Sequence, residues 1–254
     1  MTDIIVNADD FGLNEHCSKA IAEAFARGFI SSTTAMANGE YIEEAIGLAT
    51  RGGFLDSIGV HLVLTEGEPL TERIKKDPFF CRDERFHGEI NRYTPLSKAQ
   101  KDEIKEELSA QIEKLQKIGF SLDHADSHHH IHTGIFLFSP IKKVLLAHGI
   151  KKVRLHRNFG DISFLKRVVK RFYNGSLRRS GFITTEKMGS FEDLAKYPET
   201  AEKFVCEIMV HPDFNEKGEI VDRVDYEDAV AVGEKLDGIS RFLEKTKPIS
   251  FAEL

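Results

Sequence analysis

The sequence of 254 residues has few cysteines, no long apolar run and no excess of basic residues. Its three cysteines, Cys17, Cys81 and Cys206, are odd in number and far apart, which argues against a disulfide framework and against a zinc ribbon. No stretch approaches the roughly 20 apolar residues that cross a membrane. The formal net charge of −6 argues against a nucleic-acid-binding protein, because such proteins carry a basic patch.

Several sequence signals are also missing. The start, Met1-Thr2-Asp3, lacks the basic and then apolar order of a secretory signal, so we expect a cytoplasmic protein. The glycines form neither G-x-G-x-x-G nor G-x-x-x-x-G-K-[ST], which disfavours nucleotide use. The absence of G-x-S-x-G disfavours covalent serine chemistry. With 41% hydrophobic and 30% charged residues, the chain is expected to fold as a soluble globular protein of one domain.

Apolar runs and helical stripes alternate along the chain. We predict strands over residues 4–6, 30–34, 57–64, 122–125, 152–155 and 203–210. We predict helices over residues 15–27, 41–49, 97–118, 136–148 and 226–243. This alternation predicts an α/β fold with a parallel sheet and right-handed crossovers. Residues 65–96 hold three of the seven prolines and show no sustained period, which is typical of a lid or binding loop. Residues 158–190 show no clear order of elements.

Polar residues gather where the predicted strands end. They are Asp9, Asp10, His61, Asp126, His128, Arg154, His156 and His211. In a parallel α/β barrel the carboxyl ends of the strands converge on one face, where loops build the active site. These residues, although distant in sequence, are therefore expected to meet.

Histidine is concentrated in one place, with five of the 11 histidines inside residues 124–132. Imidazoles and carboxylates together suit a divalent ion such as zinc, manganese or iron, and three protein ligands leave room for water or substrate. We therefore predict a catalytic metal. His128 and His132 lie four residues apart and would share a helix face. The pattern leaves open which of the clustered histidines bind the metal.

Two further positions admit more than one interpretation. His211 follows an apolar strand and can act as a general acid or base, because histidine titrates near neutral pH, but it can equally be a turn histidine. Arg154 and Arg157 can hold a substrate, orient a catalytic carboxylate, or pair with a surface acid.

Five motifs carry a family resemblance. They are NADDFGLN (7–14), STTAMANG (32–39), GVHLVLTEGEPL (59–70), DSHHHIH (126–132) and MVHP (209–212). In this order they resemble the YdjC/ChbG-type carbohydrate deacetylases. The resemblance implies a single domain over residues 1–254 with a distorted TIM-like (β/α) barrel, its active site at the carboxyl ends of the strands.

The same resemblance implies an enzyme that hydrolyses N-acetyl groups of small chitin-derived oligosaccharides such as diacetylchitobiose, releasing acetate. It implies a divalent metal, most often magnesium, with zinc or another transition metal as an alternative, and it is compatible with a homodimer. The family's metal ligands map onto Asp10, His61 and His128.

By similarity to the NodB-type polysaccharide deacetylases, Asp9 would be the general base and His211 the general acid. Arg154 and His132 are expected to contact the substrate. Residues 65–96 would cover the sugar with flat aromatic faces, offered by Phe79, Phe80, Phe86 and Tyr93.

Three rival functions stay open. A glycosidase on the same barrel would use Asp9 with another carboxylate and release reducing ends instead of acetate. A non-catalytic metal- or sugar-binding protein is disfavoured by the presence of both Asp9 and His211. Another metal-dependent amidohydrolase or phosphoesterase is compatible with the ligand types, although the usual amidohydrolase His-x-His on the first strand is absent.

Overall fold

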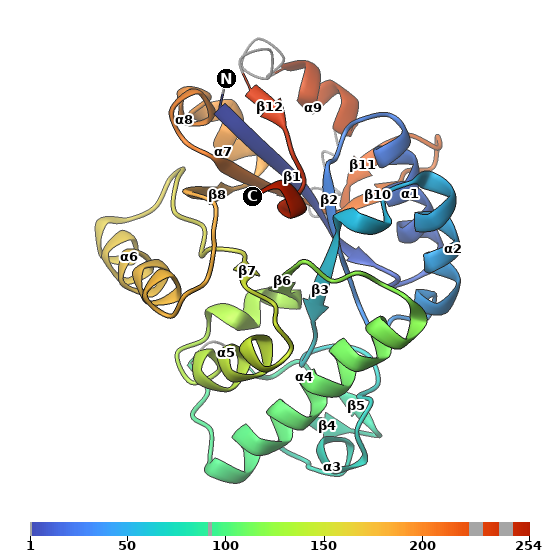
Figure 1. The fold of residues 1–254 in the computed structure, drawn as a ribbon, viewed down its shortest axis with the longest axis vertical. Helices are drawn as coiled ribbons and strands as arrows, with labels where there is room; N and C mark the ends of the chain where they lie inside the picture. The colour runs from blue at the N-terminus through green and yellow to red at the C-terminus, as the bar shows by residue number, and fades with distance from the viewer. Residues whose placement is uncertain (1, 91–92, 224–230, 239–245) are drawn as a thin grey trace.

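A curled parallel sheet forms the centre of the computed structural model, which describes residues 2–90, 93–223, 231–238 and 246–254 (Figure 1). The strand order is β7-β6-β3-β2-β1-β9-β8, with β12 paired beside β1, and every pairing in this sheet is parallel. The strands are β1 (Thr2–Phe11), β2 (Ser32–Ala35), β3 (Ile58–Leu62), β6 (His124–Ser127), β7 (Lys152–Val153), β8 (Lys187–Gly189), β9 (Cys206–Val210) and β12 (Thr246–Pro248). A parallel bridge from Lys152 to Ile183 brings the segment before β8 against β7, so the sheet curls into a distorted TIM-like barrel, as predicted.

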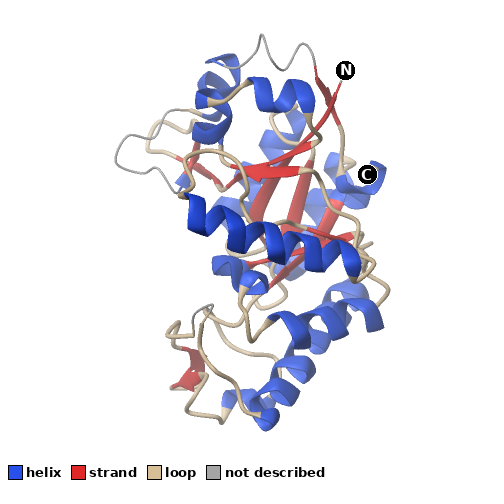
Figure 2. Ribbon diagram, turned by 90° about the vertical axis from the view of Figure 1, so that its left-hand side faces the viewer, coloured by secondary structure: helices blue, strands red, loops and turns tan. Residues whose placement is uncertain are grey.

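The helices lie around the outside of this sheet (Figures 1 and 2). They are α1 (Glu15–Ala26), α2 (Ile42–Gly52), α4 (Lys98–Ile118), α5 (Phe138–Ala147), α6 (Phe164–Arg179), α7 (Phe191–Lys196), α8 (Glu199–Lys203) and α9 (Val232–Gly238). The predicted helix over residues 226–243 lies partly outside the described residues, and α9 is its described part. Among the described residues, no helix is both long and apolar enough to cross a membrane.

Helix α4 shows how the local sequence sets an element. The Ser97 side chain accepts a hydrogen bond from the backbone N–H of Gln100, whose side chain in turn accepts one from the backbone N–H of Ser97. This capping box begins the helix as predicted, and Gly119, with φ of 117°, ends it. Ile104 and Leu108 belong to its fully buried apolar stripe. The three cysteines form no disulfide, and all three are buried.

Residues 65–96 contain more structure than predicted. They form the short helix α3 (Glu72–Lys75) and a hairpin of β4 (Cys81–Arg82) and β5 (Arg85–Phe86), which Figure 2 shows apart from the central strands. Phe80 and Phe86 are buried in the core, so the expectation that they face a sugar is wrong. A hairpin this small is stable only when it buries apolar area, and the rings of Phe80 and Phe86 supply that area. Phe79 is half-buried, and Tyr93 is exposed.

Strand β1 runs past its predicted end. It continues from residue 6 through both carboxylates to Phe11, and its register against β2 shifts between Ala8 and Phe11. Asp10 has a φ of 72°, a conformation that is rare for residues other than glycine. A local irregularity of this kind changes the directions in which side chains point, and here it affects the two adjacent carboxylates, Asp9 and Asp10.

The loops that follow β1 and β2 touch at two glycines near the same end of the sheet. A Cβ atom on Gly39 would lie 2.1 Å from the backbone oxygen of Gly12, which has no room to move aside. We expect Gly39→Ala to lower the free energy of unfolding by roughly 3 kcal/mol or more, measured by urea denaturation. Gly28→Ala is the control: its φ of +70° costs about 1 to 2 kcal/mol, but nothing lies within 4 Å. Equal losses in the two variants would contradict the proposed clash.

Candidate functional site

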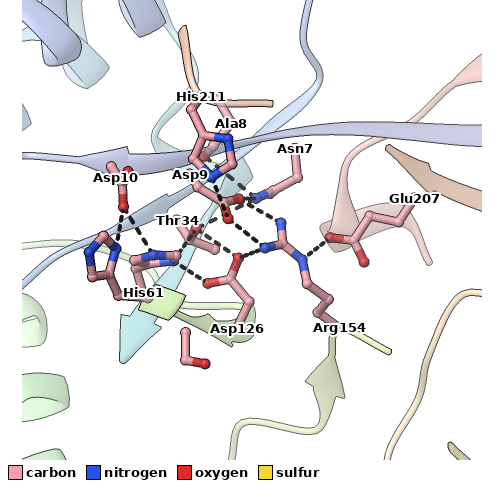
Figure 3. A network of polar contacts seen from close by, with 12 residues as sticks. Asn7, Ala8, Asp9, Asp10, Thr34, His61, Asp126, Arg154, Glu207 and His211 are labelled. Carbon is pink, nitrogen blue, oxygen red and sulfur yellow. Dashed lines mark hydrogen bonds and ion pairs between the residues drawn. The ribbon is translucent and has the colours of Figure 1, made fainter. Parts of the chain in front are cut away.

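Three residues predicted as metal ligands lie together at the carboxyl ends of β1, β3 and β6 (Figure 3). The Oδ1 atom of Asp10 is 3.1 Å from Nε2 of His61 and 2.9 Å from Nδ1 of His128. All three side chains are buried, and each offers one ligand atom within 4.8 Å of the others. A carboxylate and two imidazoles therefore converge on one small volume.

Each of these histidines is oriented by a second carboxylate. His61 Nδ1 is 2.6 Å from Asp126 Oδ1, and His128 Nε2 is 2.7 Å from Glu66 Oε2. Metal-binding histidines usually place their other ring nitrogen against a carboxylate, which fixes the ring and its tautomer. The donor set and its outer partners fit a divalent ion.

The electrostatics of His61 agree with a cation site. Burial opposes the charged form of its ring, but the carboxylates of Asp126 and Asp10 outweigh burial and raise the pKa of His61 to about 10. Burial likewise opposes ionisation of Asp10, but its hydrogen bonds to His128 and His61 hold its pKa well below the usual value. The site therefore stabilises positive charge next to an ionised carboxylate.

Asp9, the predicted base, lies beside this group and faces a different partner. Its two oxygens each accept a hydrogen bond of 2.6 Å from the terminal nitrogens of Arg154, and Asn7 donates a third of 3.0 Å to Oδ1. Burial would raise the pKa of Asp9, but the charge and hydrogen bonds of Arg154 hold it well below its usual value. Asp9 is therefore ionised and held in one orientation.

Arg154 itself is completely buried. Besides Asp9 it contacts Asp126 Oδ2 at 2.6 Å and donates from Nε to Glu207 Oε1 at 2.5 Å. This environment supports the interpretation that Arg154 orients a catalytic carboxylate. The predicted contact of Arg154 with substrate would require a ligand to reach a fully enclosed side chain.

Glu207 was missed by the sequence reasoning. It lies on β9, whose sequence is CEIMV, and the available signal was one charged residue inside an otherwise apolar strand. Burial raises the pKa of Glu207 to about 7, although Arg154 acts in the opposite direction. One guanidinium faces three carboxylates here, so a proton on Glu207 relieves the excess negative charge.

His211, the predicted acid, lies on the other side of Asp9. Its Nε2 atom is 3.7 Å from Asp9 Oδ2, and its Nδ1 atom is 3.6 Å from Asp222 Oδ1. Asp222 ends β11 (Ile220–Asp222), which pairs with β10 (Pro212–Phe214) directly after His211. Burial lowers the pKa of His211, but the contact of its ring with Asp222 and the charge of Asp9 raise it overall. The arrangement favours the protonated ring.

The histidine-rich segment does not form a regular helix. Residues His128–Thr133 make a 3₁₀ turn, η2, in which His129 and His130 have φ of 50° and 54°. The expectation that His128 and His132 share a helix face is therefore wrong, because two left-handed residues interrupt the helix between them. His132 is buried, with Nδ1 2.6 Å from Ser127 Oγ, and burial holds its pKa well below the usual value. Its predicted contact with substrate stays a prediction.

A cavity of 390 Å³ opens beside the cluster of Asp10, His61 and His128. Its lining is largely polar and includes Asn14, Asn38, Glu66, Glu68, Arg85 and Arg223. Two of these residues also touch the centre, since Glu66 contacts His128 and Arg223 donates to Asp10 Oδ2. The volume is in the range of ordinary small-molecule sites.

Comparisons with known proteins bear on the family and the fold. The model of a family described as YdjC-like protein matches residues 3–241. A carbohydrate deacetylase from Brevibacillus brevis is 34% identical over 218 residues, covering 82% of this chain and 80% of that protein. One from Listeria monocytogenes serovar 1/2a is 32% identical over 220 residues, covering 83% and 81%. A crystal structure from Enterococcus faecalis V583, of a protein proposed to cleave cellobiose phosphate, has a TM-score of 0.74 at 21% identity over 99% of this chain and 98% of that one, which shows the same fold.

The pKa of Glu207 gives a test of the charge balance around Arg154. Its folded-state value of about 7 exceeds the ordinary 4.5, so the folded protein holds a proton that the unfolded chain loses between these pH values. Stability of the wild type should therefore fall as pH rises through this window, relative to a variant that cannot titrate there. In urea denaturation we expect Glu207→Gln to gain stability relative to the wild type between about pH 5 and about pH 8. A pH-independent difference would contradict the raised pKa.

Proposed function

The chain belongs to the YdjC-like protein family, and on that premise we propose that it is a metal-dependent carbohydrate deacetylase acting on small chitin-derived oligosaccharides. The observation that carries the proposal is the meeting of three groups at one end of the sheet. The first is the buried cluster of Asp10, His61 and His128, and the second is the carboxylate of Asp9, which Arg154 holds. The third is His211, whose ring lies next to Asp9. Relatives named carbohydrate deacetylases support it.

Asp10, His61 and His128 would hold the ion, while Asp126 and Glu66 orient the two imidazoles. When bound, a divalent ion supplies Lewis acidity for the amide carbonyl and lowers the pKa of a coordinated water. Magnesium is the family expectation, but two imidazoles among three ligands suit zinc or another transition metal better.

Asp9 would accept the proton of the attacking water. Arg154 and Asn7 together occupy both lone pairs of Oδ1 and one lone pair of Oδ2, which leaves one lone pair, on Oδ2, for a proton. The contact with Arg154 makes Asp9 a weak base, so it suits a water whose own acidity has been increased. Its low pKa keeps it ionised and ready to accept the proton.

His211 would donate a proton to the departing sugar amine. An amide nitrogen leaves poorly without a proton, and the raised pKa of His211 keeps its ring charged. Asp222, bonded to the backbone N–H of His211 at 3.1 Å, holds the residue in place. Acetate and a free amino sugar are the products.

The 390 Å³ cavity would hold the sugar. Its amide, carboxylate and guanidinium side chains offer both donors and acceptors to sugar hydroxyls. The homodimer and the cytoplasmic location implied by the sequence stay predictions.

Metal removal tests the central claim. We expect metal-stripped protein to release no acetate from N,N′-diacetylchitobiose and to regain activity with added Zn²⁺, Mn²⁺, Co²⁺ or Mg²⁺. Asp9→Asn should keep the metal, measured by mass spectrometry, and lose at least about 100-fold in acetate release. Asp56→Asn makes the same chemical change at an exposed position on the 3₁₀ turn Leu55–Ser57 and should keep full activity.

The products separate the rival functions. New reducing ends in place of acetate would support a glycosidase. Failure of every ion to produce acetate would contradict deacetylation of this substrate. Full activity of Asp9→Asn would contradict the base assignment.

The acid assignment has its own test. His211→Gln removes the proton donor while retaining hydrogen-bonding capacity, so we expect kcat to fall by roughly 10² to 10⁴ with KM nearly unchanged. Metal content and unfolding midpoint should stay at wild-type values. A loss confined to KM would instead assign His211 to substrate binding.

A further inference from the structure

Helix α6 has an unusual charge distribution. The chain as a whole has a net charge of −6, yet the 16 residues of α6 contain no Asp or Glu. They contain six basic residues, Lys166, Arg167, Lys170, Arg171, Arg178 and Arg179. Figure 1 shows this helix at the edge of the molecule. A dense positive segment on an acidic protein creates a local field that attracts anions.

A groove of 570 Å³ runs between α6 and the segment of β8. Cations line both of its walls. Arg167, Arg171 and Arg178 are among those that α6 contributes, and Lys187 comes from the opposite wall. The carboxylate in this lining, Glu186, accepts a hydrogen bond from the backbone N–H of Val205 at 2.8 Å. The groove therefore has a large excess of positive charge.

Most of the groove's cations are not neutralised by a neighbouring carboxylate in the described part of the chain. Within the described parts of the chain, no ion pair joins an acidic residue to any of five of them, Arg167, Arg171, Arg178, Arg179 and Lys187. Exposed cations elsewhere do pair, for example Lys19 with Glu15 and Lys196 with Asp161. The groove thus keeps its positive charge available for a ligand.

Several of these side chains are nevertheless held in place. Arg178 donates to Thr184 Oγ1 at 3.0 Å and to the backbone oxygen of Thr185 at 2.9 Å. Lys187 lies over the ring of Phe204, 4.6 Å from its centroid. Fixed cations lose less side-chain entropy when an anion binds, which favours binding.

We propose that this groove binds a phosphate-bearing anion, at a site separate from the catalytic one. Guanidinium groups present paired N–H donors that match phosphate oxygens, and a ligand with several negative charges suits cations on two walls. The site does not depend on the proposed deacetylase activity.

The phosphate can come from two sources. The outward side of α6 exposes Phe164, Leu165, Val168, Val169 and Phe172. A basic helix with an exposed apolar face can lie on anionic lipid, whose headgroups carry phosphate. A soluble phosphorylated metabolite offers the same chemistry to the groove.

Calorimetric titration with inorganic pyrophosphate, at constant ionic strength, tests the site. We expect saturable binding by the wild type and at least about tenfold weaker binding by the double variant Arg171→Glu/Lys187→Glu. The control Arg51→Glu/Lys217→Glu changes the net charge equally at exposed positions outside the groove and should bind like the wild type. Unfolding midpoints of both variants confirm that they are folded.

Cosedimentation with phosphatidylglycerol vesicles, against phosphatidylcholine vesicles, separates the sources. Binding to the anionic vesicles that is lost in the groove variant assigns a lipid headgroup, whereas pyrophosphate binding alone assigns a soluble ligand. The proposal is overturned if the wild type binds neither probe. It is overturned equally if the groove variant binds like the wild type, or if the control variant loses as much affinity.

Discussion

The buried guanidinium of Arg154 is the interaction on which the rest of the centre depends. It joins Asp9 on β1, Asp126 on β6 and Glu207 on β9, strands that occupy different positions in the sheet order. Without this cation, three carboxylates would be buried close together without their main opposite charge, which is strongly destabilising. Because Asp126 also holds His61, the same cation indirectly orients a predicted metal ligand. Fold stability and site geometry therefore share one charge network.

The network also explains how two adjacent carboxylates acquire different surroundings. Successive side chains of a regular strand point to opposite faces, so Asp9 and Asp10 would be separated by the sheet. The register shift and the positive φ of Asp10 bring both into one centre (Figure 3). Asp9 then faces arginine and Asp10 faces two histidines. One backbone irregularity therefore gives Asp9, the proposed base, and Asp10, the proposed metal ligand, different partners within one centre.

Much of the fold and the centre could be predicted because their signals are local. Apolar periodicity and capping residues predict the strands and α4. The position of polar residues at the ends of predicted strands identifies Asp9, Asp10, His61 and His128 as site candidates. The partners Glu66, Glu207 and Asp222 could not be found this way, since their roles arise from contacts between elements distant in sequence. The left-handed residues of η2 were hidden for another reason, because histidine, although enriched at positive φ, adopts that conformation in only a small minority of positions. The comparisons confirm the family and fold, while the roles of individual site residues stay predictions.

The order of helices and strands in residues 158–190 could not be predicted from the sequence. The physical reason also concerns the groove beside α6. A helix that covers a sheet normally turns its apolar stripe inward, and that stripe is what periodicity detects. In α6 most of the apolar residues, such as Phe164 and Phe172, are exposed, and the residues that it buries are Asn174 and Leu177. The pattern therefore does not describe a core-facing helix, although a helix forms. Segments whose sequence departs from the rules of stable packing often serve binding, and α6 combines this departure with four arginines that form no ion pair with a carboxylate among the described residues. Core stability does not require either feature, so interaction with a ligand or surface is the more economical explanation for both.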